Sequence, residues 1–153
     1  MNIFVVDNDP VVAATMLCDK HVVKMIVETA QMLCTVGRAN GHNVRYKSTH
    51  AKHPCTLWTG KSKQNWDWVV KHGLSMCEEY TRRYGKRHKT HDVIESLANL
   101  PIDLPNTGLT PYAQAMPEKY KSDDAVEAYR NYYKHEKGGF ATWKTENIPS
   151  WYA

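Results

Sequence analysis

The segment from Pro10 to Val36 constrains the fold of this chain most, because it is long and almost continuously helix-forming. It contains no glycine and no proline after its first residue. Asp9 can cap its first turn, a proline fits the first helical position, and "GRANG" at 37–41 ends the pattern. We therefore predict one long helix here, with a bend near Cys18.

A narrow polar stripe runs along the second half of this segment. Lys20, Lys24, Glu28 and Gln31 recur at helical spacing, and His21 borders them. Apolar side chains fill almost every other direction, which is typical of a helix at the centre of a fold. The stripe is either a solvated face, with a Lys24–Glu28 ion pair of about 0.3–0.5 kcal/mol, or the lining of a reaction site. We favour the site, because a central helix has little open surface.

The rest of the chain predicts shorter helices joined by loops. Residues 2–6 are apolar and suited to extended structure, and residues 37–53 read as a polar, basic loop. A second long helix is expected at 62–84, capped by Ser62 and closed by Gly85. Further helical turns are expected from residue 53, from 90 or 91 to 100, within 110–117 and at 123–136, and the aromatic tail 140–153 is expected to pack back. The predicted fold is mostly α: a single compact domain over residues 1–153, with four to five helices and a short N-terminal extended segment.

Charge and composition restrict the partners of the chain. The net charge is +4 with eight histidines, and basic residues are densest in "RRYGKRHKTH", residues 82–91, a pattern that attracts phosphate. A mildly basic helical domain that binds no nucleic acid would carry the same charge. No apolar run approaches the roughly 20 residues of a membrane span, so we expect a cytoplasmic protein. The four cysteines lie far apart and are expected to be buried free thiols.

Several catalytic motifs are missing from the sequence. There is no G-x-x-x-x-G-K-[ST], G-x-G-x-x-G, G-x-S-x-G or H-E-x-x-H, so triphosphate hydrolysis and serine hydrolase chemistry have no support. His50 and His53 are three residues apart, as are His88 and His91, but a metal needs three or four converging ligands. We therefore expect no metal and no other cofactor, and loop histidines that bind phosphate or water.

Aromatic residues collect in the second half of the chain. Tyr129, Tyr132 and Tyr133 flank Arg130 and could stack on a base while the guanidinium holds its phosphate. The same residues could equally form the aromatic side of a core helix.

Across nearly its whole length the chain is similar to a family of small, mostly uncharacterised phage and bacterial proteins. The shared motifs are "D-x-D-P", "DKHVVKM", "HPC-x-x-W", "EEYTRRYGKRHK", "LTPYAQAMP" and "YRNYY". More distantly, the pattern Asp19-x-His21-x6-Glu28 resembles the catalytic helix of the phage pyrimidine-dimer DNA glycosylases of the endonuclease V type. The basic loop ending at Pro54, the helix ending in "RRYGK" and the aromatic carboxyl end follow the same order.

This second resemblance implies a particular chemistry. In those enzymes the main-chain amino terminus is the nucleophile, and a glutamate of that helix supports the reaction. The implied catalytic groups here are Glu28, His21 and the amine of Met1, because Asn2 is too large for efficient removal of the methionine. An α-amine titrates near about 8, against about 10 for lysine, so more of it is nucleophilic at neutral pH.

The leading hypothesis is a phage-type DNA glycosylase, with or without abasic lyase activity, that acts on a damaged or modified base. If a phage encodes it, it would act in the host cytosol. Two arginines of the resembled catalytic helix correspond to Val27 and Gln31 here, so the basic loop and residues 82–89 would have to hold the DNA. The expected substrate-binding residues are Lys24, Gln31, Lys47, His50, His53, Asn65, Arg82, Arg83, Tyr129, Arg130 and Trp143.

Two alternatives stay open. The first is an enzyme or binder of a small nucleotide or nucleoside, which would use the same cleft. The second is a non-catalytic phage accessory protein that binds a host protein. DNA is thus the expected partner and a nucleotide ligand the second, no membrane is expected, and the sequence assigns no oligomeric state.

Overall fold

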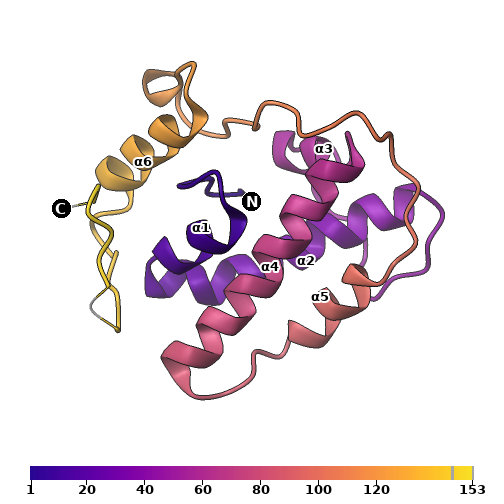
Figure 1. Cartoon of the computed structure of the whole chain (residues 1–153), viewed down its shortest axis with the longest axis horizontal. Coiled ribbons are helices and arrows are strands. Elements are labelled where there is room, and N and C mark those ends of the chain that lie inside the picture. The colour runs from indigo at the N-terminus through magenta and orange to yellow at the C-terminus, as the bar shows by residue number, and fades with distance from the viewer. Residues whose placement is uncertain (146, 153) are drawn as a thin grey trace.

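A computed structural model describes residues 1–145 and 147–152, and within them it contains six α-helices, one 3-10 turn and no strand. In chain order these are α1 (Pro10–Met16), α2 (Asp19–Ala39), α3 (Pro54–Thr59), α4 (Lys63–Tyr84), α5 (His91–Ala98), the 3-10 turn (Glu118–Tyr120) and α6 (Ala125–Glu136). Figure 1 shows their arrangement. The mostly α fold is confirmed, with one helix more than the upper number predicted.

The two long helices, α2 and α4, form the centre of the molecule (Figure 1). α4 contacts α1, α2, α3 and α5, and α2 also contacts α3 and α5. Gly73 of α4 makes the approach close, since a Cβ there would lie 3.1 Å from side-chain atoms of both Thr29 on α2 and Ile94 on α5. Both helices bury apolar side chains in one continuous core, as expected for helices that are apolar on more than one face.

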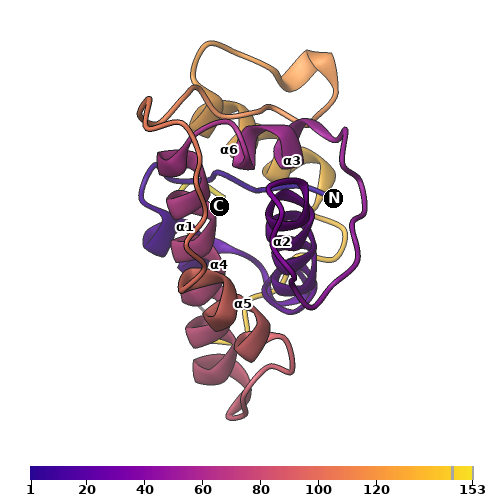
Figure 2. The ribbon, with the colours of Figure 1, turned by 90° about the vertical axis from the view of Figure 1, so that its right-hand side faces the viewer.

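The N-terminal segment, residues 2–6, is extended and buried, and it runs beside α2 (Figure 2). The ring of Phe4 stacks on His21 of α2 at 4.5 Å and meets Tyr133 of α6 edge-on at 5.4 Å. Arg130 of α6 donates from Nε to the carbonyl of Val6 at 2.8 Å. The segment is therefore held by side chains of two helices and not by a sheet partner.

The single bent helix predicted for residues 10–36 is wrong, because the chain breaks it into α1 and α2. Leu17 and Cys18 both have extended backbone angles. The N–H of Cys18 donates to the hydroxyl of Tyr133 at 2.8 Å, and that of Asp19 donates to the carbonyl of Thr142 at 2.7 Å. These partners from the far end of the chain replace the helical hydrogen bonds that a continuous helix would make.

The predicted helix ends are mostly confirmed. Asp9 accepts a hydrogen bond from Val11 N, Ser62 accepts one from Asn65 N, and Gly85 ends α4 with a φ of 70°. The helical turn predicted within 110–117 is not formed. Backbone groups there are bound by side chains, such as Thr110 N by Asn65 Oδ1 at 3.0 Å, and the short turn comes later, at 118–120.

The described part of the tail packs back as predicted. Trp143 is buried and donates from Nε1 to the carbonyl of Met16 at 3.0 Å, while Glu146 and Ala153 lie outside the described residues. Cys18, Cys34, Cys55 and Cys77 are buried free thiols, as expected. Among the described residues, none of the helices combines the length and apolarity that a bilayer crossing requires.

Candidate active site

The amino group of Met1 lies 2.9 Å from Oε1 of Glu28, in the middle of α2. The side chain of Glu28 is only 12% exposed, and Oε1 has no partner among the described residues apart from this amine. Nζ of Lys24, one turn earlier on α2, lies 3.8 Å from the other oxygen, Oε2. The carboxylate is thus sheltered and has one cation facing each oxygen.

Met1 has a buried side chain and a partly exposed main chain. Its side chain is 2% exposed, although the residue as a whole is half-buried. The exposed surface of the residue therefore belongs mainly to the main chain, which carries the amine. The buried apolar side chain anchors the terminus, and the amine lies next to Glu28.

Two histidines from the loop before α3 lie beside this pair. Burial is the main cause that lowers the pKa of His53, and the positive charges of the Met1 terminus and His50 lower it further, against the opposing effect of Glu28. Nδ1 of His53 accepts the N–H of Cys55 at 3.1 Å, so the neutral ring carries its proton on Nε2. We call Met1, Lys24, Glu28, His50 and His53 the terminal-amine site.

The loop that carries these histidines is fixed to α2. Oγ1 of Thr35 donates to the carbonyl of Gln31 at 2.8 Å, lies 3.1 Å from the carbonyl of Thr49 and accepts the N–H of Thr49 at 3.0 Å. Arg38 donates to the carbonyl of Tyr46 at 2.8 Å. His50 has a φ of 51°, which is uncommon outside glycine and keeps the loop turned. The polar stripe of α2 is therefore partly covered, while Lys24 on the stripe and Lys47 in the loop are exposed.

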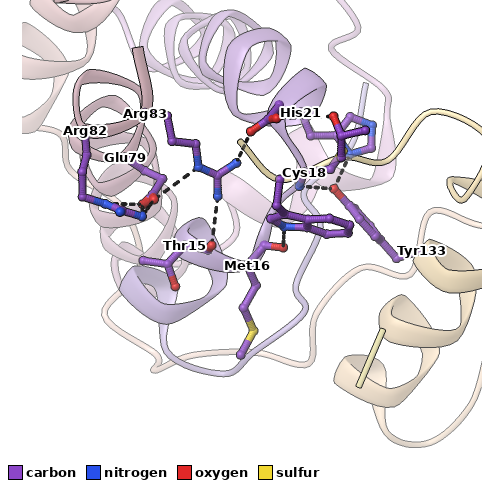
Figure 3. A network of polar contacts seen from close by, with 11 residues as sticks. Thr15, Met16, Cys18, His21, Glu79, Arg82, Arg83 and Tyr133 are labelled. Carbon is purple, nitrogen blue, oxygen red and sulfur yellow. Dashed lines mark hydrogen bonds and ion pairs between the residues drawn. The ribbon is translucent and has the colours of Figure 1, made fainter. Parts of the chain in front are cut away.

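His21 lies in a separate group that we call the corner cluster: Asp19, His21, Glu79, Arg83 and Tyr133. Figure 3 labels all of these residues except Asp19. The ring of His21 is buried, and its Nδ1 lies 2.8 Å from the Tyr133 hydroxyl. Because that hydroxyl already accepts the Cys18 N–H, its proton is free to point at Nδ1 of a neutral ring. Burial, and then the charges of Lys137, Lys24 and Lys20, lower the pKa of His21 to about 4.

The charges of the corner cluster satisfy one another (Figure 3). Arg83 donates to Asp19 at 3.1 Å, to Glu79 at 3.3 Å and to the carbonyl of Thr15 at 3.0 Å. Arg82 pairs with the same glutamate. Trp143 closes the corner from the tail side through its bond to Met16. The structure thus does not bring His21, Arg82, Arg83 or Trp143 to the terminal-amine site.

Three more of the residues predicted to bind substrate have hydrogen-bond partners within the fold. Asn65 is fully buried and binds the carbonyl of Trp58 and the side chain of Thr110. Arg130 holds the carbonyl of Val6, and Tyr129 is buried with its hydroxyl 3.1 Å from Asn2. The sequence did not predict the contacts of Asn2, because the type of residue at position 2 does not reveal partners more than a hundred positions away.

The basic run after α4 borders a hollow of about 450 Å³. Its lining includes Val27 of α2, Tyr46, Tyr80 and residues 86–90. Arg87 is engaged by two carboxylates, whereas Lys86 and Lys89 are exposed. Since neighbouring helical residues point about 100° apart, this hollow opens on the side of α2 next to the one that carries Glu28.

Comparison with known proteins adds one finding. The sequence model of a protein family described as pyrimidine dimer DNA glycosylase matches residues 1–92, more than half of the chain. The chain belongs to this family. The matched region contains every residue of the terminal-amine site, and the predicted resemblance is confirmed. Membership of this glycosylase family supports DNA as the substrate. No curated protein and no solved structure matches the chain.

Proposed function

We propose that this member of the pyrimidine dimer DNA glycosylase family is a DNA glycosylase with abasic lyase activity, in which the Met1 amine is the nucleophile. The observation that carries the proposal is the 2.9 Å contact between that amine and the sheltered carboxylate of Glu28. An amine and a carboxylate at hydrogen-bond distance satisfy the geometric requirement for a nucleophile and its proton acceptor.

In the first half of the proposed reaction, the unprotonated Met1 nitrogen attacks C1′ of a damaged nucleotide that has flipped out of the duplex. The C1′–N bond to the base breaks, and its electron pair leaves with the base, which takes up a proton. Glu28 stabilises the positive charge that develops on the sugar and accepts a proton from the attacking nitrogen. Ring opening at the C1′–O4′ bond then gives a Schiff base, with O4′ protonated.

The lyase half follows from the electron demand of that Schiff base. The C2′ proton becomes acidic, so its removal can expel the 3′ phosphate as the C3′–O bond breaks. Water then hydrolyses the imine and restores the amine. Lys24, Lys47 and His50 are exposed or border the site, and in this proposal they bind the phosphates that flank the flipped nucleotide.

The test uses duplex DNA with a single pyrimidine dimer or a single abasic site. Glu28→Gln keeps the shape of the side chain but removes its charge, and Glu78→Gln makes the same change at an exposed position of α4. We expect the wild type and E78Q to cleave the strand and to form a covalent complex in borohydride, and E28Q to be slower by about 10²–10⁴-fold. Cleavage by E28Q at the wild-type rate, or no covalent complex with either DNA, would overturn the proposal.

A further inference from the structure

Asn2 connects the N-terminus to three distant parts of the fold. Its Nδ2 donates to the carbonyl of Ala115 at 2.9 Å. Its Oδ1 accepts the N–H of Ile3 at 2.8 Å and lies 3.1 Å from the Tyr129 hydroxyl and 3.5 Å from Sγ of Cys55. The partners belong to the loop after α5, to α6 and to α3. Both polar side-chain atoms of a residue that is only 8% exposed are therefore engaged.

The contacts differ in strength. The Tyr129 hydroxyl has one proton, and the carbonyl of Ala113, at 2.6 Å, is its nearer acceptor. A thiol such as that of Cys55 is a weak donor. The bonds to Ile3 and Ala115 therefore determine the position of Asn2, and Tyr129 acts mainly by holding the N–H of Ala115 at 3.2 Å.

This degree of order is unusual at a chain end, which normally frays. Burying an amide lowers stability unless its hydrogen bonds are replaced, and an apolar side chain would fill the same space without that requirement. Only two soft backbone torsions separate the Asn2 Cα from the Met1 nitrogen, because the peptide bond between the two residues is planar. Fixing Asn2 therefore fixes the amine that faces Glu28.

We propose that Asn2 is a positioning residue that keeps the terminal amine within ion-pair distance of Glu28. Its kinetic consequence rests on the proposed function, whereas its effect on the amine does not. A terminus that moved by even one residue would shift the amine by about 3.8 Å, beyond hydrogen-bond distance from the carboxylate. Small misplacements of a reacting group are known to reduce rates by about 10²-fold.

The test compares Asn2→Leu with Asn131→Leu, the same change at an exposed position of α6. Leucine is close to asparagine in size, so it should also retain Met1, which an intact mass verifies. The first measurement is the rate at which an amine-reactive ester acylates the Met1 nitrogen at pH 7, read from the N-terminal peptide. We expect N2L to react at least fivefold faster than the wild type and N131L to match it.

The second measurement is the rate of borohydride trapping on abasic-site DNA, alongside DNA affinity. We expect N2L to trap about 10–100-fold more slowly, with its affinity within about twofold of the wild type, because Asn2 does not touch DNA in this account. This split separates positioning from a general loss of structure. If N2L does not fold, Asn2→Gln, which keeps the amide but lengthens the side chain, is judged by the same labelling criterion.

The outcomes are distinguishable. Equal acylation rates in the wild type and the Asn2 variant overturn the inference, whatever the trapping gives. A wild type that forms no covalent complex overturns the proposed function, while the acylation rates still decide the role of Asn2.

Discussion

Two polar clusters both include residues of α2. Asp19 belongs to the corner cluster, and Glu28, about two and a half turns later, belongs to the terminal-amine site. In the corner cluster every charge has a charged partner: Arg83 bonds to Asp19 and Glu79, and both carboxylates are buried or nearly so. In the terminal-amine site, Glu28 faces a chain terminus and a lysine whose side chain is 65% exposed. The charges of the corner cluster are thus paired inside the fold, whereas the carboxylate of the terminal-amine site faces a main-chain amine and an exposed lysine.

In the proposed function, the corner cluster serves stability and the terminal-amine site serves chemistry. Hydrogen bonds in and beside the corner cluster join α4 to α2 and to α1, and the tail to α1 (Figure 3). At the terminal-amine site, the partner of the carboxylate is a primary amine, which is a nucleophile once it loses a proton. The comparison therefore predicts that substitutions in the corner reduce stability, whereas substitutions at the terminal-amine site reduce activity.

The largest effect is expected for Arg83→Met. Removing the guanidinium leaves Glu79 and Asp19 with buried charge that is only partly compensated, which should lower the free energy of unfolding by about 3–5 kcal/mol. Urea unfolding at pH 7 measures it. E28Q serves as the comparison and should lower stability by less than R83M does, because glutamine keeps the size of the side chain and one of the two cations beside it is exposed. A larger loss in E28Q than in R83M would break the distinction between the two clusters.

The next effect concerns the identity of the amine. Asn2→Ser introduces a small second residue, so we expect Met1 to be removed during expression, which an intact mass reveals. The new terminus lies about 3.8 Å farther along the chain, and trapping on abasic-site DNA should fall by about 10²-fold. A fully processed N2S protein that traps at the wild-type rate would contradict the assignment of Met1.

The third effect is a pH dependence of stability that comes from the corner cluster. The pKa of His21 is about 4 in the fold and about 6.5 when the chain is unfolded. The unfolded chain therefore binds more protons between these values, and the stabilising contribution is complete above pH 6.5 and lost as pH falls towards 4. From pH 7 to pH 5 this amounts to about 2 kcal/mol.

His21→Asn isolates that contribution, because buried His72, whose pKa is also lowered to about 4, remains in both proteins. Urea unfolding at pH 7, 6 and 5 should show a shallower decline in H21N than in the wild type. Parallel declines would mean that His21 does not stay neutral inside the corner cluster.

The smallest effect is expected for Lys24→Gln. Its exposed ammonium contacts Oε2 of Glu28 at 3.8 Å and, in this account, also meets a DNA phosphate. We expect DNA affinity to fall by only a few fold and the slope of log affinity against log salt to decrease by about one. Titrations at several salt concentrations measure both, and an unchanged slope would remove Lys24 from the DNA contacts.

Local chemistry predicted much of the fold. The caps at Asp9 and Ser62 and the left-handed Gly85 were evident because each acts within four residues of its own position. The sheltered position of Glu28 could also be predicted, since a lone acid on a broadly apolar helix needs a partner. Its partner could be named only through the family resemblance.

What failed depends on contacts from the far end of the chain. Hydrophobic periodicity could not reveal that the hydroxyl of Tyr133 would bind the N–H of Cys18 where α2 begins. It also could not reveal that the same hydroxyl would contact Nδ1 of His21. Spacing also could not reveal that Asn65 and Arg83, both predicted to contact substrate, would find partners inside the protein. Asn2, bonded to Ala115, is the clearest example of a role that only the folded chain reveals.

The most direct test of the central claim is to identify the atom that carries the trapped sugar. After borohydride reduction on abasic-site DNA, the complex is digested and its peptides are sequenced by mass spectrometry. We predict the adduct on the α-nitrogen of Met1, in the N-terminal peptide, and much slower formation of this adduct in E28Q. An adduct on a lysine side chain such as that of Lys24, with the Met1 amine unmodified, would contradict it.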